Sequence, residues 1–316
     1  MRKLWIGMAL LIGLLMSPIT AAAATGPAAD DSGALDARAA AARTGDNAEA
    51  KASGVTASWY SGTVAAGASQ TWYWNNANPF EAAYQVGYSP VGATTGKACR
   101  FETVNAIYQR YSNGERKFVF TIKNSGTIAC GTTVLLASLT GSYFSNTGTL
   151  SPGQSQTRSA TSDFDILQLA GVLPFASGST PCQIELGSTS HRNPSAGKWE
   201  FWFTVRNVGA VACSANLYLA SAPKDIGWRT FTDLGPGETY YGTWNNANPV
   251  NATYLVMGWP FVAPNGVVCQ LSVARTYYRQ VINSSGFAER RFSFEIRNIG
   301  SNTCYDVHVA MATLAA

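Results

Sequence analysis

The chain has 316 residues, with 22 Lys and Arg residues, 18 Asp and Glu residues and a formal net charge of +4 at pH 7. The basic residues are spread along the sequence without a cluster, whereas a nucleic-acid-binding surface is a concentrated basic stripe, so we expect no nucleic-acid partner. The roughly 260 residues after the N-terminal segments can hold one large domain or several small ones.

The N-terminal residues have the organisation of a secretory signal. Two basic residues, Arg2 and Lys3, precede an apolar run over residues 4–16 and then a stretch of small residues. This pattern predicts a signal peptide over residues 1–24, because the apolar run is too short to span a membrane comfortably. Residues 25–55 are rich in Ala, Gly and Asp and nearly lack large apolar residues, which predicts a disordered spacer or pro-segment. We therefore expect a secreted, extracellular protein without an integral membrane segment in its mature chain.

Three segments of the remaining chain share one pattern: KFVFTIKNSGTIAC at 117–130, WEFWFTVRNVGAVAC at 199–213 and RFSFEIRNIGSNTC at 291–304. In each segment apolar residues occupy alternate positions, an N-x-G follows, and a cysteine comes six residues after the Asn. A period of two is typical of a half-buried strand. We interpret the N-x-G as a turn, because Asn and Gly tolerate positive φ.

A turn and a further strand precede each copy of this pattern, in GTVAAGASQTWYW, GTLSPGQSQTRSA and TDLGPGETYYGTW. The spacing predicts three repeats, over residues 56–139, 140–222 and 223–316. About six or seven short strands in each, separated by Gly, Pro and Asn, are typical of a small antiparallel β-sandwich. We therefore predict an all-β chain of three tandem immunoglobulin-like antiparallel β-sandwich repeats.

The same motifs carry a family resemblance. The F-x-V/I-x-N-x-G phrase, an apolar strand, and an L-x-P-G turn before a Thr- and Ser-rich strand resemble bacterial extracellular immunoglobulin-like modules of the CARDB type. The resemblance implies β-sandwich modules on a secreted or surface protein. It transfers no catalytic residues, and the cysteines are an addition to the family pattern.

Each predicted repeat contains two cysteines. Six cysteines allow fifteen pairings, and the repeat pattern selects one bridge inside each repeat. Export to an oxidising compartment favours disulfides. Because no C-x-x-C is present and the histidines are distant in sequence, we expect no metal site and no cofactor. The predicted pairs are Cys99–Cys130, Cys182–Cys213 and Cys269–Cys304.

The sequence contains few candidates for catalysis. Of its two histidines, His191 lies in the turn-rich STSHRNPSAG, where we expect a surface residue, and His308 lies in a predicted strand. Neither is near a G-x-S-x-G elbow, so no Ser-His-Asp triad is predicted. A glycoside hydrolase with paired carboxylates stays an alternative, with Asp163, Asp165 and Glu295 as candidates. We predict a protein without enzyme activity.

The segment WNNANP occurs twice, at 74–79 in the first predicted repeat and at 244–249 in the third. The middle repeat has SATSDFD instead, although it keeps both cysteines and the Phe strand, so the sandwich does not require the motif. Trp can stack on the apolar face of a sugar, and Asn amides donate and accept hydrogen bonds as sugar hydroxyls do. The predicted ligand-binding residues are Trp74, Asn75, Asn76, Asn78 and Tyr84 of the first repeat and Trp244, Asn245, Asn246, Asn248 and Tyr254 of the third.

Other interpretations of this motif remain open. Asn-rich segments that end in Pro are common turns, and the Trp residues can pack between repeats. Tyr and Arg in AIYQRY (106–111) and TYYRQV (276–281) are residue types enriched in recognition surfaces. We predict a lectin-like protein that binds glycans or other cell-surface components. A structural or adhesive spacer that contacts other proteins without a small ligand is the alternative, and an inhibitor of secreted proteases is a further one.

Overall fold

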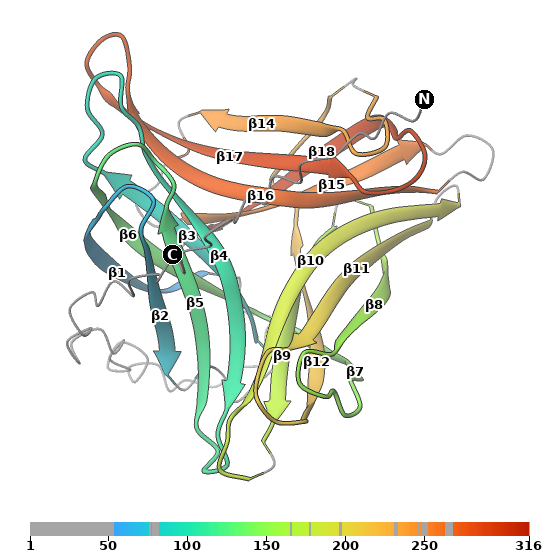
Figure 1. Ribbon diagram of the computed structural model, residues 1–316. Helices are drawn as coiled ribbons and strands as arrows, with labels where there is room; N and C mark the ends of the chain where they lie inside the picture. Colours follow the sequence, from blue (N-terminus) through green and yellow to red (C-terminus); the bar gives the residue numbers. More distant parts are fainter. Residues whose placement is uncertain are drawn as a thin grey trace, which may run out of the picture. The chain divides into compact units, whose positions relative to one another are not determined.

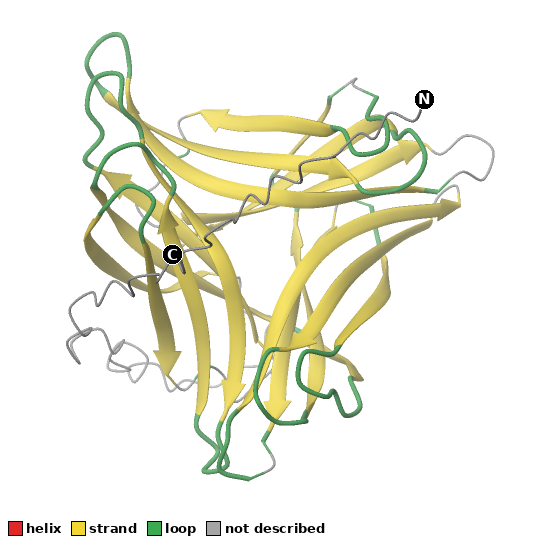
Figure 2. Cartoon of the chain, viewed as in Figure 1, coloured by secondary structure: helices red, strands yellow, loops and turns green. Residues whose placement is uncertain are grey.

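The computed structural model describes residues 54–75, 77, 82–164, 166–176, 178–195, 198–230, 233–245, 247, 252–262 and 268–315. All of them belong to one compact unit, residues 34–316. Within these ranges the chain forms strands and loops (Figure 2), and no helix there is long and apolar enough to cross a membrane. The predicted signal peptide and the spacer up to residue 53 lie outside the described residues.

The described residues form eighteen strands, which we group in chain order into three strand sets of six (Figure 1). The first set is β1 (Gly54–Val64), β2 (Ser69–Asn75), β3 (Ala82–Val91), β4 (Cys99–Arg110), β5 (Arg116–Asn124) and β6 (Cys130–Thr140). The second set is β7 (Ser142–Asn146), β8 (Ser155–Ser162), β9 (Ile166–Phe175), β10 (Cys182–Ser195), β11 (Lys198–Asn207) and β12 (Ser214–Pro223). The third set is β13 (Ile226–Arg229), β14 (Thr239–Asn245), β15 (Ala252–Val262), β16 (Cys269–Ile282), β17 (Ala288–Asn298) and β18 (Tyr305–Ala315).

The strands pair in the same way in every set. The first, third and sixth strands form a three-stranded sheet, in the orders β1-β6-β3, β7-β12-β9 and β13-β18-β15. The second, fourth and fifth strands of all three sets join one nine-stranded sheet. Every named pairing is antiparallel. The all-β, antiparallel prediction is therefore confirmed.

Three long strands, β4, β10 and β16, connect the strand sets, because each pairs with both of the others. The first residue of each lies opposite a late residue of another, as Cys182 opposite Arg110, Cys269 opposite Asn193 and Cys99 opposite Gln280. Between these two pairing segments every long strand has a register shift against its hairpin partner. Such a bulge bends the strand, which turns it from one neighbour toward the next. The sets are thus joined in a cycle by backbone hydrogen bonds.

The fifth strand of each set carries the alternation that the sequence predicts. In β5, Phe118, Phe120 and Ile122 are at most 1% exposed, whereas the residues between them are partly exposed. Phe201 and Phe203 of β11 and Phe292 and Phe294 of β17 are buried in the same way. Burying a large apolar side chain contributes about 1.5–3 kcal/mol, so these rows anchor the core on one face of the nine-stranded sheet.

The side chain of the Asn in each N-x-G makes hydrogen bonds to three backbone groups, an arrangement that we call the Asn tie. Asn124 is fully buried, and its Nδ2 donates hydrogen bonds to the carbonyl oxygens of Val64 and Ile128, both at 2.8 Å. Its Oδ1 accepts a hydrogen bond from the backbone N–H of Gly126 at 3.0 Å. Asn207 and Asn298 make the same three types of bond in the other two sets.

The chain bends after each of these Asn residues without using the positive φ that Asn and Gly tolerate, because neither residue of the N-x-G has one in any set. Gly126 is required for a different reason, since a Cβ there would lie 2.8 Å from the carbonyl oxygen of Ala98. Positive φ occurs instead at the turn before the second strand, at Gly67 with 77°. The backbone N–H of Gly67 donates to the carbonyl oxygen of Asn124 at 2.8 Å, so the turn and the tie form one unit.

The three predicted disulfides, Cys99–Cys130, Cys182–Cys213 and Cys269–Cys304, are confirmed. In every set the bridge joins the first residue of the fourth strand to the beginning of the sixth strand or the residue just before it. Each bridge therefore links a three-stranded sheet to the nine-stranded sheet. Three buried disulfides indicate an oxidising, extracellular type of environment.

Candidate functional site

Trp74 of the WNNANP motif lies inside the core. It belongs to β2, lies opposite Phe118 of β5 and is only 6% exposed. Its ring centroid is 5.7 Å from that of Trp59, and its side chain hydrogen-bonds to Tyr84. An indole in this position has no free face on which a ligand could stack.

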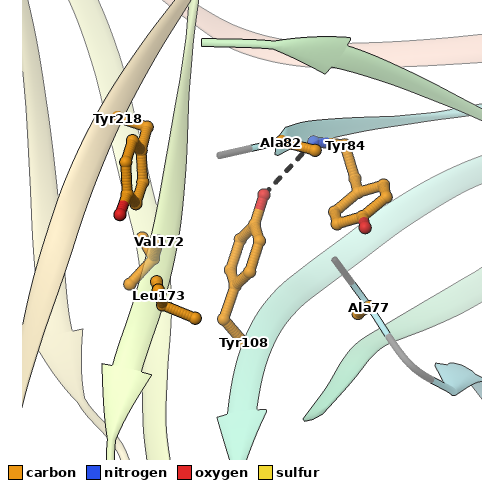
Figure 3. Close-up of a pocket in the computed structure, with 7 residues that line it drawn as sticks. All are labelled: Ala77, Ala82, Tyr84, Tyr108, Val172, Leu173 and Tyr218. Atoms are coloured by element: carbon orange, nitrogen blue, oxygen red, sulfur yellow. Dashed lines mark hydrogen bonds between the residues drawn. The ribbon is translucent and has the colours of Figure 1, made fainter. Parts of the chain in front are cut away.

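Tyr84, the second aromatic residue of the predicted site, is also buried. Its ring stacks on Phe118 with centroids 4.8 Å apart, and its backbone N–H donates a hydrogen bond to the hydroxyl of Tyr108 at 3.2 Å (Figure 3). Burial raises the pKa of both phenols above the ordinary tyrosine range. The cavity between these rings and Leu173 has a volume of only about 10 Å³, which holds no more than about one water molecule.

The third set repeats this arrangement. Trp244 of β14 lies opposite Phe292 and is half-buried against the core. Tyr254 is 5% exposed, and its backbone N–H donates to the hydroxyl of Tyr278 at 2.8 Å. The aromatic residues of both motifs therefore contribute to packing in both sets.

The asparagines that follow the two tryptophans point the other way, because successive side chains of a strand alternate between its faces. Asn75 ends β2 opposite Lys117, and Asn245 ends β14 opposite Arg291. Asn75 is half-buried and Asn245 is exposed. The other predicted asparagines, Asn76, Asn78, Asn246 and Asn248, lie outside the described residues.

We call the side of the nine-stranded sheet away from the buried phenylalanines the outward face. At each joint between strand sets, four side chains of this face form a row across four neighbouring strands. The rows are Asn75–Lys117–Gln109–Gln183, Thr161–Glu200–Arg192–Gln270 and Asn245–Arg291–Arg279–Arg100. The two WNNANP segments thus supply the first member of two rows, and the middle set supplies Thr161 there.

Aromatic rings on the outward face are paired with cations. The guanidinium of Arg100 lies 3.7 Å from the ring centroid of Tyr277, and Lys117 Nζ lies 5.1 Å from that of Tyr73. Tyr241 of β14, which points to the same face as Asn245 four residues later, is 70% exposed. Such a surface combines flat apolar rings with amide and cationic hydrogen-bond donors.

An ion-pair group holds the joint between the first and third sets. Arg275 of β16 donates two hydrogen bonds to Glu102 of β4, from Nε to Oε2 and from Nη2 to Oε1, the second at 2.7 Å. Its Nη1 lies 4.0 Å from Oε1 of Glu295 in β17. Burial alone would raise the pKa of Glu102, but Arg275 outweighs it and holds that pKa below its ordinary value. The pair is therefore charged at neutral pH and fixes the register of this joint.

His191 differs from its sequence-based expectation of a surface residue. It lies in β10, is 3% exposed and contacts Trp259 with ring centroids 4.9 Å apart. Burial lowers its pKa to about 3, so the ring is neutral. The long strand β10 continues to Ser195, through most of the turn-like segment, and so places His191 at the buried position held by Tyr108 and Tyr278 in the other sets.

The carboxylates that we considered for a hydrolase are only partly described. Glu295 is engaged by Arg275, Asp163 follows the end of β8, and Asp165 lies outside the described residues. Within the described part of the chain, no group of three metal-ligating side chains gathers.

Comparisons of the chain with known proteins found no match. No family model matches the chain, and neither a curated protein nor a solved structure matches it. The resemblance to CARDB-type modules therefore stays a prediction.

Proposed function

We propose that the chain is an exported, non-enzymatic binding protein built of three tandem immunoglobulin-like β-sandwich repeats with one disulfide each. The proposal is supported by the identical strand order of the three sets and by the Asn tie and disulfide that recur in each. Export is supported by the signal-like N-terminal sequence and by the disulfides.

Its ligand in this proposal is carbohydrate, bound on the outward face. The observation that carries it is the outward side of β14, where Tyr241 is 70% exposed and the exposed Asn245, about 13 Å farther along the strand, lies opposite Arg291. A phenol ring offers a flat surface for the C–H face of a sugar. The amide and the guanidinium offer hydrogen bonds to the hydroxyls of another sugar unit of the same glycan. These three side chains point away from the core, so they serve no packing that a ligand would disturb.

The burial of Trp74 changes the way in which the WNNANP motif takes part. Its indole packs the core, and the Asn that follows it points outward. We therefore assign the sugar contact to the alternating outward residues of the edge strand. In the third set these are Tyr241, Thr243 and Asn245 of β14, and in the first set Thr71, Tyr73 and Asn75 of β2 take the matching positions in that order.

A glycan array probed with the exported protein tests this proposal. We expect binding to a defined group of glycans, and at least about a tenfold loss of affinity in the double variant Tyr241→Ala plus Asn245→Ala. Tyr143→Ala is the matched control, because Tyr143 is 57% exposed but lies in a separate three-stranded sheet. Absence of any glycan binding, or an equal loss in the control, would contradict the proposal.

A structural or adhesive spacer is the second candidate function. It is favoured by the burial of Trp74 and Ala77, because these residues of the WNNANP motif then serve only the scaffold. Sizing chromatography of the exported protein without ligand separates the two candidates. Concentration-dependent self-association with no glycan bound would favour the spacer, and a monomer that binds glycan would exclude it.

A further inference from the structure

Three arginines of the outward face lie side by side at the joint between the first and third sets. Arg279 of β16 lies directly opposite Arg100 of β4 on one side and Arg291 of β17 on the other. Like charges directly opposite each other across strands destabilise a sheet. Adjacent strands are about 4.8 Å apart, so this arginine row concentrates its charge within about 10 Å.

Carboxylates neutralise only part of this charge. Glu289 binds Arg291 through two hydrogen bonds of 2.7 and 2.9 Å, and Glu102 is engaged by Arg275. Among the described residues neither Arg100 nor Arg279 has an ion pair, and the Nε atoms of both are buried without a hydrogen-bond partner. The arginine row therefore presents two guanidinium groups, those of Arg100 and Arg279, that no carboxylate of the described residues binds directly. Glu102 and Glu295 act on Arg100, and Glu289 on Arg279, only at longer range.

The fold does not require arginine at these positions. The matching three residues are Gln183, Gln109 and Lys117 at the joint between the first and second sets, and Gln270, Arg192 and Glu200 at the joint between the second and third. Both of those joints form the same backbone pairing. The unfavourable concentration of like charge is thus specific to one joint, and a bound anion is the simplest compensation for it.

We propose that the arginine row binds the anionic groups of an acidic polysaccharide, a chain that carries sulfate or carboxylate groups. The planar guanidinium binds such groups through two parallel hydrogen bonds, which a lysine cannot reproduce. Arg100 is held in place by its stack on Tyr277, and Asn245 at the end of the row adds an amide for a neighbouring hydroxyl. This inference rests on the proposed function and names the class of its carbohydrate.

The test compares the full exported protein with variants in which arginines of the row are replaced by the residues found at the matching positions of another joint. Arg100→Gln plus Arg279→Gln introduces the residues found at Gln183 and Gln109, and Arg279→Gln alone is the milder variant. Arg192→Gln is the control, because it removes one arginine from the outward face at another joint. Affinity for dextran sulfate, uncharged dextran and duplex DNA is measured by titration calorimetry at two salt concentrations, after the urea midpoint has shown that each variant folds.

We expect dextran sulfate to bind the wild-type protein and the control equally, and more weakly at high salt. The loss should be about tenfold for each arginine removed from the row. An undiminished affinity of the folded variants, an equal loss in the control, or equally strong binding of duplex DNA would overturn the assignment.

Failure of this inference can be told apart from failure of the proposed function. If the array shows binding of uncharged glycans that depends on Tyr241 while dextran sulfate does not bind, the acidic-polysaccharide assignment fails and the proposed function stands. If no carbohydrate binds at all, both fail.

Discussion

Replacing Asn207 by alanine should destabilise the protein strongly, because its side chain ties three backbone groups together. Its Nδ2 donates to the carbonyl oxygens of Leu150 and Val211, both at 2.8 Å, and its Oδ1 accepts from the N–H of Gly209 at 2.9 Å. The Leu150 carbonyl keeps a second donor, the N–H of Cys213 at 3.1 Å. Within the described chain the Val211 carbonyl and the Gly209 N–H have no hydrogen-bond partner besides Asn207.

One lost hydrogen bond and two unpaired, partly buried backbone groups together cost about 3 kcal/mol of unfolding free energy. Urea denaturation with the disulfides intact, followed by tryptophan fluorescence, measures this cost. Asn113→Ala is the control, because Asn113 makes one bond, of 2.9 Å to the N–H of Glu115, in an exposed turn, and should change the stability by about 0.5 kcal/mol or less. An Asn207→Ala protein within about 1 kcal/mol of the wild type would refute the assignment of this residue as an Asn tie.

Three further predictions follow from burial, the disulfides and charge. Trp74→Ala should lower the unfolding free energy by about 3–5 kcal/mol, because Trp74 is buried. Tyr73→Ala, on the opposite face of the same strand, should lower it by much less. Equal losses in urea titrations would argue against an indole that points into the core. Removing the Cys182–Cys213 bridge by double alanine substitution should cost about 3–4 kcal/mol, and an unchanged melting temperature would contradict this. Burial depresses the pKa of His191 to about 3, so between that value and its ordinary 6.5 the unfolded chain binds a proton that the folded chain does not. Stability should therefore fall as the pH is lowered through this window, and His191→Phe should flatten the profile of urea midpoint against pH; an identical slope in both proteins would exclude His191 as the cause.

The strands and the disulfides could be predicted from local patterns. The alternation of Phe118, Phe120 and Ile122 marks a half-buried strand without any knowledge of its neighbours, and the recurring cysteine spacing selects the pairs that form. The direction of Trp74 was also within reach, because a strand that buries it must turn Asn75 outward. The prediction that Trp74 and Asn75 contact the same ligand overlooked that alternation.

The arginine row and the burial of His191 could not be predicted in this way. Arg100, Arg279 and Arg291 become neighbours only through the register between strands of different sets, and single-strand patterns do not encode that register. For the same reason the even spread of basic residues along the sequence did not indicate their concentration on one face. His191 lies in a segment with turn-like composition, and tertiary pairing with two neighbouring strands overrides that local preference.

Hydroxyl-radical footprinting of the exported protein, with and without a glycan identified on the array, tests most directly that the outward face is the binding surface. Tyr241 and Tyr277 should lose reactivity when the glycan is bound, because both lie on that face. Tyr60 and Tyr143, which are exposed on strands of the three-stranded sheets, should react as before. Protection of Tyr60 or Tyr143 with no change at Tyr241 and Tyr277 would contradict the account.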